Sequence, residues 1–186
     1  MSRWNELFDD LEAQAQVLST AERAAEIEDR TRYETGRLGL VDRLLPAIGA
    51  SIQLRGAGGL SVAGRLERAH PEWLLVAEDA GREALVAVAA VVSIGGLGRW
   101  SAAPGGQSAV DARLSLRQAL RAIVRDRSTV RIHLLDGSVL DGTLDRVGAD
   151  FVELAEHPVG ESRRHGEITA LLAVALASIA AVRRDG

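Results

Sequence analysis

The chain contains no cysteine and no lysine, and only 3% of its 186 residues are aromatic. The absence of cysteine excludes disulfide bonds, thiolate metal sites and cysteine nucleophiles. With so few aromatic rings, aliphatic side chains must form the core. Hydrophobic residues make up 47% of the chain and charged residues 26%, a balance typical of a globular protein and not of a disordered one.

Long hydrophobic segments are also missing. The first residues are acidic and polar, the opposite of a secretory signal peptide. The longest apolar run, residues 168–182, contains many alanines, a threonine and a serine, and is short for a membrane span. It predicts buried strands, and we therefore expect a cytoplasmic protein with no membrane partner.

The basic residues are all arginine, 22 in number, and the net charge is −4 with a pI near 5.6. The arginine bias indicates a GC-rich coding sequence more than selection for arginine chemistry. A strong, nonspecific nucleic-acid binder usually carries a large basic excess, which this chain lacks. The acidic balance still leaves room for a local basic patch.

The first 36 residues predict an acidic helical arm. Trp4, Leu7, Phe8 and Leu11 follow helical spacing, and Ser19 with Glu22 forms a capping-box pattern before a second helical stretch. Nine acidic residues stand against four arginines in residues 1–36. We expect the apolar side of this arm to pack on the rest of the chain or on a second copy.

The remaining sequence aligns with itself at a shift of 78 residues. Ile52 then matches Val130, Gly64 matches Gly142, and Trp73 matches Phe151. Beyond this block the register slips by ten residues, so that Val91 and Ile94 meet Ile179 and Val182. The pattern predicts two related units, residues 37–98 and 113–186, joined by a flexible linker over residues 99–112 that is rich in small residues.

Within the second unit, the residues after the predicted helix alternate between apolar and polar. Asp136-Gly137 is a strong hairpin signal between two such runs, and Gly142 suggests a sharply bent returning strand. The expected fold class is α+β. It consists of two tandem small five-stranded bent β-barrels of Sm-like or SH3-like type, each preceded by a helix, behind the helical arm.

The motif V-x-I-x-L-x-D-G-x-x-L-x-G-x-L resembles the Sm-like fold, in particular the bacterial Sm-like RNA chaperones. It is carried by Val130, Ile132, Leu134, Asp136, Gly137, Leu140, Gly142 and Leu144, followed by Asp150, Phe151 and Val152, with a weaker version at Leu54, Gly59, Val62, Gly64 and Leu66. The chain also resembles uncharacterised proteins of high-GC Gram-positive bacteria. Membership of the Sm-like family would imply assembly into rings through strand pairing, and single-stranded RNA bound by loop residues. The family's polar base-contacting residues have no counterpart in residues 88–91 or 175–178.

A basic stripe is the main candidate site. Arginines recur every fourth residue along the helix predicted over residues 113–127, and this is the most basic region of the chain. The candidate contacts for nucleic acid or a partner are Arg113, Arg117, Arg121, Arg125 and Arg127. The alternative is that the stripe pairs with the acidic arm or is a solvated face.

Other residue types indicate no chemistry. His70, His133, His157 and His165 lack metal-ligand spacing, and no nucleophile, phosphate-loop or dinucleotide motif occurs. Trp73 and Phe151 occupy matching positions and are expected in the core, whereas Trp100 lies outside both units as a candidate anchor. We expect no enzyme, no cofactor, no metal and no small-molecule substrate.

Two functions follow from this pattern. The first is a non-enzymatic protein-interaction or scaffolding module whose partner is another protein or a second copy of the chain. The alternative is a regulator that binds RNA or another nucleic acid through the basic helix 113–127 and the barrel loops.

Overall fold

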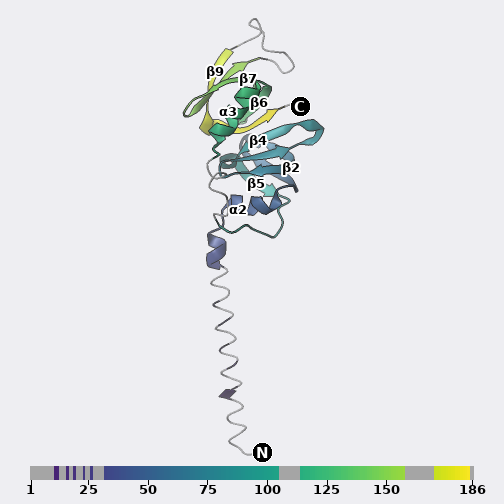
Figure 1. Ribbon diagram of the computed structural model, residues 1–186, viewed down its shortest axis with the longest axis vertical. Coiled ribbons are helices and arrows are strands. Elements are labelled where there is room, and N and C mark those ends of the chain that lie inside the picture. The colour runs from purple at the N-terminus through teal and green to yellow at the C-terminus, as the bar shows by residue number, and fades with distance from the viewer. Residues whose placement is uncertain are drawn as a thin grey trace, which may run out of the picture. The chain divides into compact units, whose positions relative to one another are not determined.

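The computed structural model describes residues 11, 12, 16, 19, 23, 26, 32–104, 114–157 and 170–184. The chain divides into two units, Met1–Gly39 and Leu40–Gly186. In the first unit residues 32–36 are helical, and most of the predicted acidic arm lies outside the described residues. Every strand that the structure describes belongs to the second unit (Figure 1).

The second unit contains two sets of five strands, each entered through a helix. The first set follows α2 (Leu40–Leu44) and the 3-10 turn η1 (Leu45–Ala47), and comprises β1 (Ser51–Gly56), η2 (Ala57–Gly59), β2 (Ser61–Ala69), β3 (Trp73–Ala77), η3 (Asp79–Gly81), β4 (Glu83–Ala87), η4 (Val88–Ala90) and β5 (Val91–Gly95). The second set follows α3 (Leu116–Asp126) and comprises β6 (Thr129–Leu134), β7 (Val139–Val147), β8 (Phe151–Glu156), β9 (Ala170–Ala175), η6 (Leu176–Ser178) and β10 (Ile179–Arg184).

Local sequence signals explain where α3 begins and ends. The Ser115 side chain accepts a hydrogen bond from the Gln118 amide, and the Gln118 side chain accepts one from the Ser115 amide, which is a complete capping box. Arg127 ends the helix in the left-handed conformation, with φ of 54°. The helix therefore lies within the predicted range 113–127, and Leu120 is its fully buried anchor.

The predicted hairpin at Asp136-Gly137 joins β6 to β7. Gly137 has φ of +90°, a conformation that favours glycine. The Asp136 carboxylate accepts hydrogen bonds from the Ser138 amide at 2.8 Å and the Ser138 hydroxyl at 2.6 Å. These hydrogen bonds from Ser138 to the Asp136 side chain stabilise the turn between β6 and β7.

Both long strands carry a bulge at corresponding places. The strand β2 has a bulge between Leu66 and Arg68 in its pairing with β3, and β7 has one between Leu144 and Arg146 in its pairing with β8. A Cβ added to Gly142 would lie 2.2 Å from the Ala155 carbonyl oxygen, so this close approach of backbones requires glycine. The glycine and the bulge together let the strand curve strongly.

All ten strands form one antiparallel sheet with the order β5-β1-β2-β3-β4-β10-β6-β7-β8-β9. The first five positions and the last five have the same internal order, because β10 stands beside β6 as β5 stands beside β1. The two sets meet where β4 pairs with β10 (Figure 1). The outermost strands are β5 and β9.

The predicted pair of closed five-stranded barrels is therefore wrong. Each set leaves two outer strands, and closing a barrel would require them to pair within the set. Instead β4 of the first set pairs with β10 of the second, and the sheet runs on as an open sheet of ten strands. This pairing satisfies the backbone groups of two edges at once, which removes the need for closure there.

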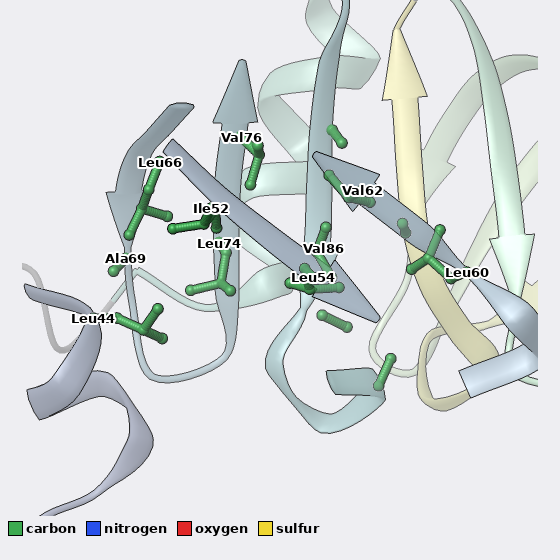
Figure 2. Packing of buried hydrophobic residues seen from close by; sticks show 14 of the residues in the cluster. Leu44, Ile52, Leu54, Leu60, Val62, Leu66, Ala69, Leu74, Val76 and Val86 are labelled. Atoms are coloured by element: carbon green, nitrogen blue, oxygen red, sulfur yellow. The ribbon is translucent and has the colours of Figure 1, made fainter. Parts of the chain in front are cut away.

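Two clusters of buried side chains form the core, and they interlock at the β4·β10 junction. The first lies around Leu44, Ile52, Leu54, Leu66 and Leu74 (Figure 2), and it also contains Ala180 and Ala181 of β10. The second lies beneath α3 and contains Trp73 and Leu85 of the first set. Since each cluster takes side chains from both strand sets, the two sets pack as one body.

The close backbone approach at Gly142 gives a stability test. We expect Gly142→Ala to lower the free energy of unfolding by about 1–3 kcal/mol, because the methyl group must displace the backbone of β8. Urea unfolding followed by circular dichroism measures the change. The matched control is Gly95→Ala, whose added Cβ meets only the Gln53 carbonyl oxygen at 3.8 Å and should shift stability by less than about 0.5 kcal/mol. Equal losses in the two variants would contradict this account of the bend.

Candidate interaction surfaces

The junction of β4 and β10 is the first surface of interest, because it joins two edges inside one chain. Val86 lies opposite Ala181, Leu85 opposite Val182, and Glu83 opposite Arg184. The side chains at the centre of this junction are buried and apolar. The two edges therefore bury apolar side chains against each other.

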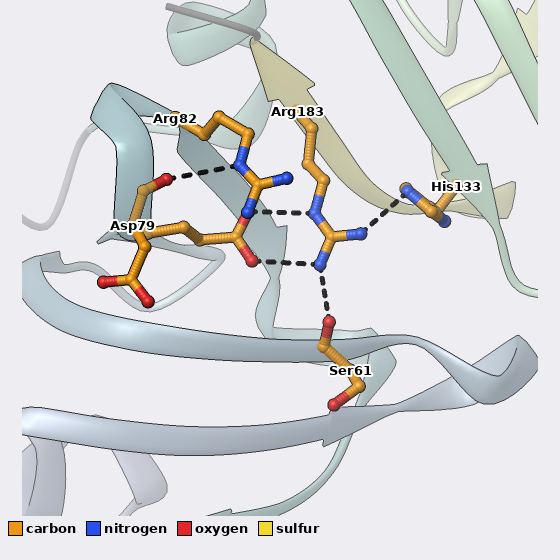
Figure 3. Close-up of polar contacts among 6 residues, drawn as sticks. Ser61, Asp79, Arg82, His133 and Arg183 are labelled. Carbon is orange, nitrogen blue, oxygen red and sulfur yellow. Dashed lines mark hydrogen bonds and ion pairs between the residues drawn. The ribbon is translucent and has the colours of Figure 1, made fainter.

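A polar cluster centred on Arg183 lies beside this junction. The Arg183 guanidinium donates to the two Glu78 carboxylate oxygens at 3.0 and 3.1 Å. It also donates to the Ser61 carbonyl oxygen and, at 3.1 Å, to Nε2 of His133 (Figure 3). The Arg183 and Glu78 side chains are only 22% and 9% exposed. One guanidinium on β10 thus connects residues next to β3, at the start of β2 and on β6.

The surroundings of His133 in this cluster lower its pKa and favour the neutral ring. Burial lowers its pKa below the usual value of 6.5, and the nearby cations of Arg183 and Arg131 lower it further. Asp141 and Glu78 act in the opposite direction without overcoming these effects. A neutral ring suits the geometry, because its Nε2 must accept the hydrogen bond from Arg183.

The outer strands β5 and β9 form a second pair of edges. Neither strand contains a charged residue or a proline, since their sequences are VVSIG and ALLAVA. Val92 on β5 is 71% exposed and Leu171 on β9 is 62% exposed. In the part of the chain that the structure describes, no strand pairs with the outer side of either one.

The basic stripe lies on and just beyond α3. Arg117, Arg121, Arg125 and Arg127 are all exposed, while Arg113 lies outside the described residues. Across residues 114–157 and the other described segments, no hydrogen bond or ion pair holds these four side chains. Pairing with the acidic arm remains a prediction, because the arm's acidic side chains are mostly not described.

The histidines and core aromatics have structural surroundings. His70 stacks on Trp73 with ring centroids 4.1 Å apart, and Trp73 Nε1 donates to the Leu114 carbonyl oxygen at 2.8 Å. The buried His157 ring contacts the Thr143 hydroxyl at 2.8 Å, and His165 lies outside the described residues. No group of three or more potential ligand side chains among the described residues could hold a metal ion.

Trp100 is 80% exposed, although the backbone around it is held. The Arg43 guanidinium donates to the carbonyl oxygens of Trp100 at 2.8 Å and Gly98 at 2.7 Å. The Ala102 amide donates to the Asp42 carbonyl oxygen at 2.8 Å. The start of the predicted linker 99–112 is thus fastened to α2, and residues 105–113 lie outside the described part.

Sequence reasoning found the basic stripe and missed the Arg183 cluster and the outer edges. The partners of Arg183 lie 50 to 122 residues away in the chain, so no local motif marks them. The sequences of β5 and β9 contain no charged residue, and this could have indicated the unprotected edges. That observation becomes informative only when the strand order shows that these two strands are the outermost ones.

Comparison with known proteins adds no assignment: no family model matches the chain, and no curated protein is significantly similar to it. Among the described residues, no helix combines the length and the hydropathy needed to cross a membrane.

The His133 contact predicts an acid-sensitive contribution to stability. Because the pKa of His133 is lower in the folded state, protons bind the unfolded chain preferentially as pH falls below about 6.5. The stabilisation is therefore fully present above that pH and declines as pH drops toward the lowered folded-state pKa. Urea unfolding of the native chain and of His133→Gln between pH 7.5 and 5 should show a shallower decline in the variant. Identical slopes would exclude His133 as the source.

Proposed function

We propose that this chain is a non-enzymatic scaffolding module that assembles with copies of itself, β5 of one copy pairing with β9 of the next. The observation that carries the proposal is the β4·β10 pairing inside the chain. It joins one outer strand from each set and leaves one from each set at the ends of the sheet.

The two remaining edges correspond to the two that already pair. The 3-10 turns η4 and η6 are three residues each; η4 lies between β4 and β5, and η6 lies between β9 and β10. When the two sets are aligned at these turns, β9 is equivalent to β4 and β5 is equivalent to β10. This agrees with the match of Ile94 to Val182 in the sequence. The junction between β4 and β10 thus supplies a template for pairing between copies.

The template gives a specific register. Inside the chain Val182 lies opposite Leu85. Their counterparts are Ile94 on β5 and Ala173 on β9, so we expect these two residues to lie opposite each other across the contact. Ala173 is exposed and Ile94 is half-buried in the single chain, which leaves both accessible to a partner strand.

The composition of the edges supports the same conclusion. Exposed edges in proteins that remain single usually carry charged residues or proline, which prevent pairing with another chain. Neither β5 nor β9 has such protection, and each exposes one large aliphatic side chain. Because the two edges differ, the contact is head-to-tail and builds either a closed ring or an open filament.

The absence of native cysteine allows a direct test of this register. Ile94→Cys and Ala173→Cys are placed in one chain and oxidised. Directly opposite residues of antiparallel strands have Cα atoms about 4.5–5.5 Å apart, within the range for a disulfide. We expect a ladder of covalent oligomers on a non-reducing gel, and light scattering of the native chain should give a mass above that of one copy.

The matched control combines Ile94→Cys with Ala175→Cys, two residues along the same face of β9. That diagonal separation of about 7–8 Å is too long for a disulfide, so cross-linking should fall by about tenfold or more. A single-copy mass together with no ladder from the first pair would overturn the proposal. Equal cross-linking of both pairs would refute the register.

Nucleic-acid binding through α3 is the second candidate. It is favoured by the exposure of Arg117, Arg121, Arg125 and Arg127, none of which is paired within the described segments. Such a stripe can follow a phosphate backbone, whose binding weakens steeply with salt.

A salt titration with mixed-sequence single-stranded RNA tests this candidate. The change Arg117→Ala/Arg121→Ala/Arg125→Ala should lower the slope of log K against log salt by about 2, because up to three phosphate contacts are lost. The control Arg55→Ala/Arg65→Ala/Arg82→Ala removes the same charge from exposed positions elsewhere. No binding by the native chain at low salt, or equal losses in both variants, would eliminate this candidate.

A further inference from the structure

A pocket of about 420 Å³ lies beneath α3, at the place where the two strand sets join. Its wall comes from α3 and from strands of both sets, including Trp73 and Leu75 of β3, Leu85 of β4 and Val182 of β10. The volume falls within the range of about 300–1,000 Å³ that small-molecule sites occupy. None of its lining residues belongs to β5 or β9, so the pocket is separate from the proposed assembly edges.

On the α3 side, the pocket is lined in part by small side chains. The helix contributes Ala119 and Ala122 to the wall, together with the larger Ile123. A methyl side chain does not reach the sheet as a leucine would, and a space lined mainly by apolar atoms is left. An apolar space of this kind favours an apolar occupant.

One buried polar atom of a pocket-lining residue has no partner among the described residues. The Ser128 hydroxyl oxygen has almost no exposed surface and forms no hydrogen bond to the described residues, although Ser128 lines the pocket. A buried hydroxyl without a partner is unfavourable, and native proteins rarely leave one so. Rotation of the Ser128 side chain about its Cα–Cβ bond would turn this hydroxyl toward the pocket, where an occupant carrying one hydroxyl or carbonyl oxygen would satisfy it.

The charged groups around the pocket balance. Arg68 and Arg184 line it together with Glu83 and Asp126, and Arg184 forms an ion pair with Asp126 at 3.0 Å. This arrangement offers no excess charge of either sign to an ionic ligand. The surroundings therefore favour a neutral molecule.

We propose that this pocket binds a small neutral ligand with an apolar body and a single hydroxyl or carbonyl oxygen that hydrogen-bonds to Ser128. The site joins residues of both strand sets, so binding also stabilises their contact. Ligand binding in this pocket requires neither self-assembly of the chain nor nucleic-acid binding by α3.

The test uses the full chain and three probes of equal length: octanol, octanoate and octylammonium. Binding is followed by calorimetry and by fluorescence of Trp73 in a Trp4→Phe/Trp100→Phe background. We expect octanol to saturate one site per chain, and the two charged probes to bind at least about tenfold more weakly, because a charge must be desolvated without a free counter-charge.

Variants then locate the site. Ala119→Leu and Ala122→Leu fill the pocket from two positions, and each folded variant should lose octanol binding by about tenfold or more. Ser128→Ala should weaken octanol by about fivefold and remove its advantage over a hydrocarbon of the same length. Arg121→Leu, which adds a leucine to the same helix outside the pocket, should leave affinity unchanged.

Three results would overturn the proposal. They are the absence of saturable octanol binding to the full chain, unchanged binding in a folded Ala119→Leu or Ala122→Leu variant, and a preference for either charged probe. A filling variant that changes the oligomer mass and not ligand affinity would assign the pocket to a second copy of the chain, which also contradicts it.

Discussion

The hydrogen bonds between β4 and β10 are the interaction on which the rest of the structure depends. They turn two five-stranded sets into one sheet and bring Ala180 and Ala181 into the first core and Trp73 and Leu85 into the second. A backbone edge left unpaired beside these apolar side chains would be both costly and prone to the wrong pairing. Pairing the two edges within the chain solves both problems, and it creates the pocket beneath α3 as a consequence of where the sets meet.

Apolar contacts alone specify this junction poorly, because alanine and valine side chains can pack in more than one register. The Arg183–Glu78 pair supplies the missing specificity. Its two hydrogen bonds, at 3.0 and 3.1 Å, are satisfied only when β10 stands at one position beside the turn that follows β3. A partly buried ion pair adds little net stability, but a shift in register would leave both charges unpaired at high cost. The hydrogen bond from Arg183 to His133 also fixes the position of β10 relative to β6. This hydrogen bond depends on the His133 ring staying neutral.

Local signals in the sequence predicted local structure correctly. The Asp136-Gly137 hairpin and a helix within residues 113–127 are present, and at Gly142 the backbone of the neighbouring strand comes so close that glycine is required. Closure of the sheet could not be predicted in this way, because an alternating strand has the same side-chain pattern whether its outer edge closes a barrel or pairs with another set. The choice depends on backbone groups that every residue shares. The Arg183 cluster was missed for a related reason: its members come from distant strands and match no motif. The basic stripe was found because a helix places residues four apart on one side.

The difference between the inner junction and the outer edges has a consequence for assembly as proposed. The linker holds β4 and β10 in one chain, so their pairing occurs at a high effective concentration and is not diluted away. Pairing of β5 with β9 between copies depends on protein concentration. In the alignment of the two sets, Gly95 at the end of β5 and Gly96 directly after it stand where β10 has Arg183 and Arg184. The contact between copies therefore lacks the guanidinium groups that fix the inner junction. It follows that, in the assembly as proposed, the single chain is the permanent unit and pairing between chains is the weaker and reversible step.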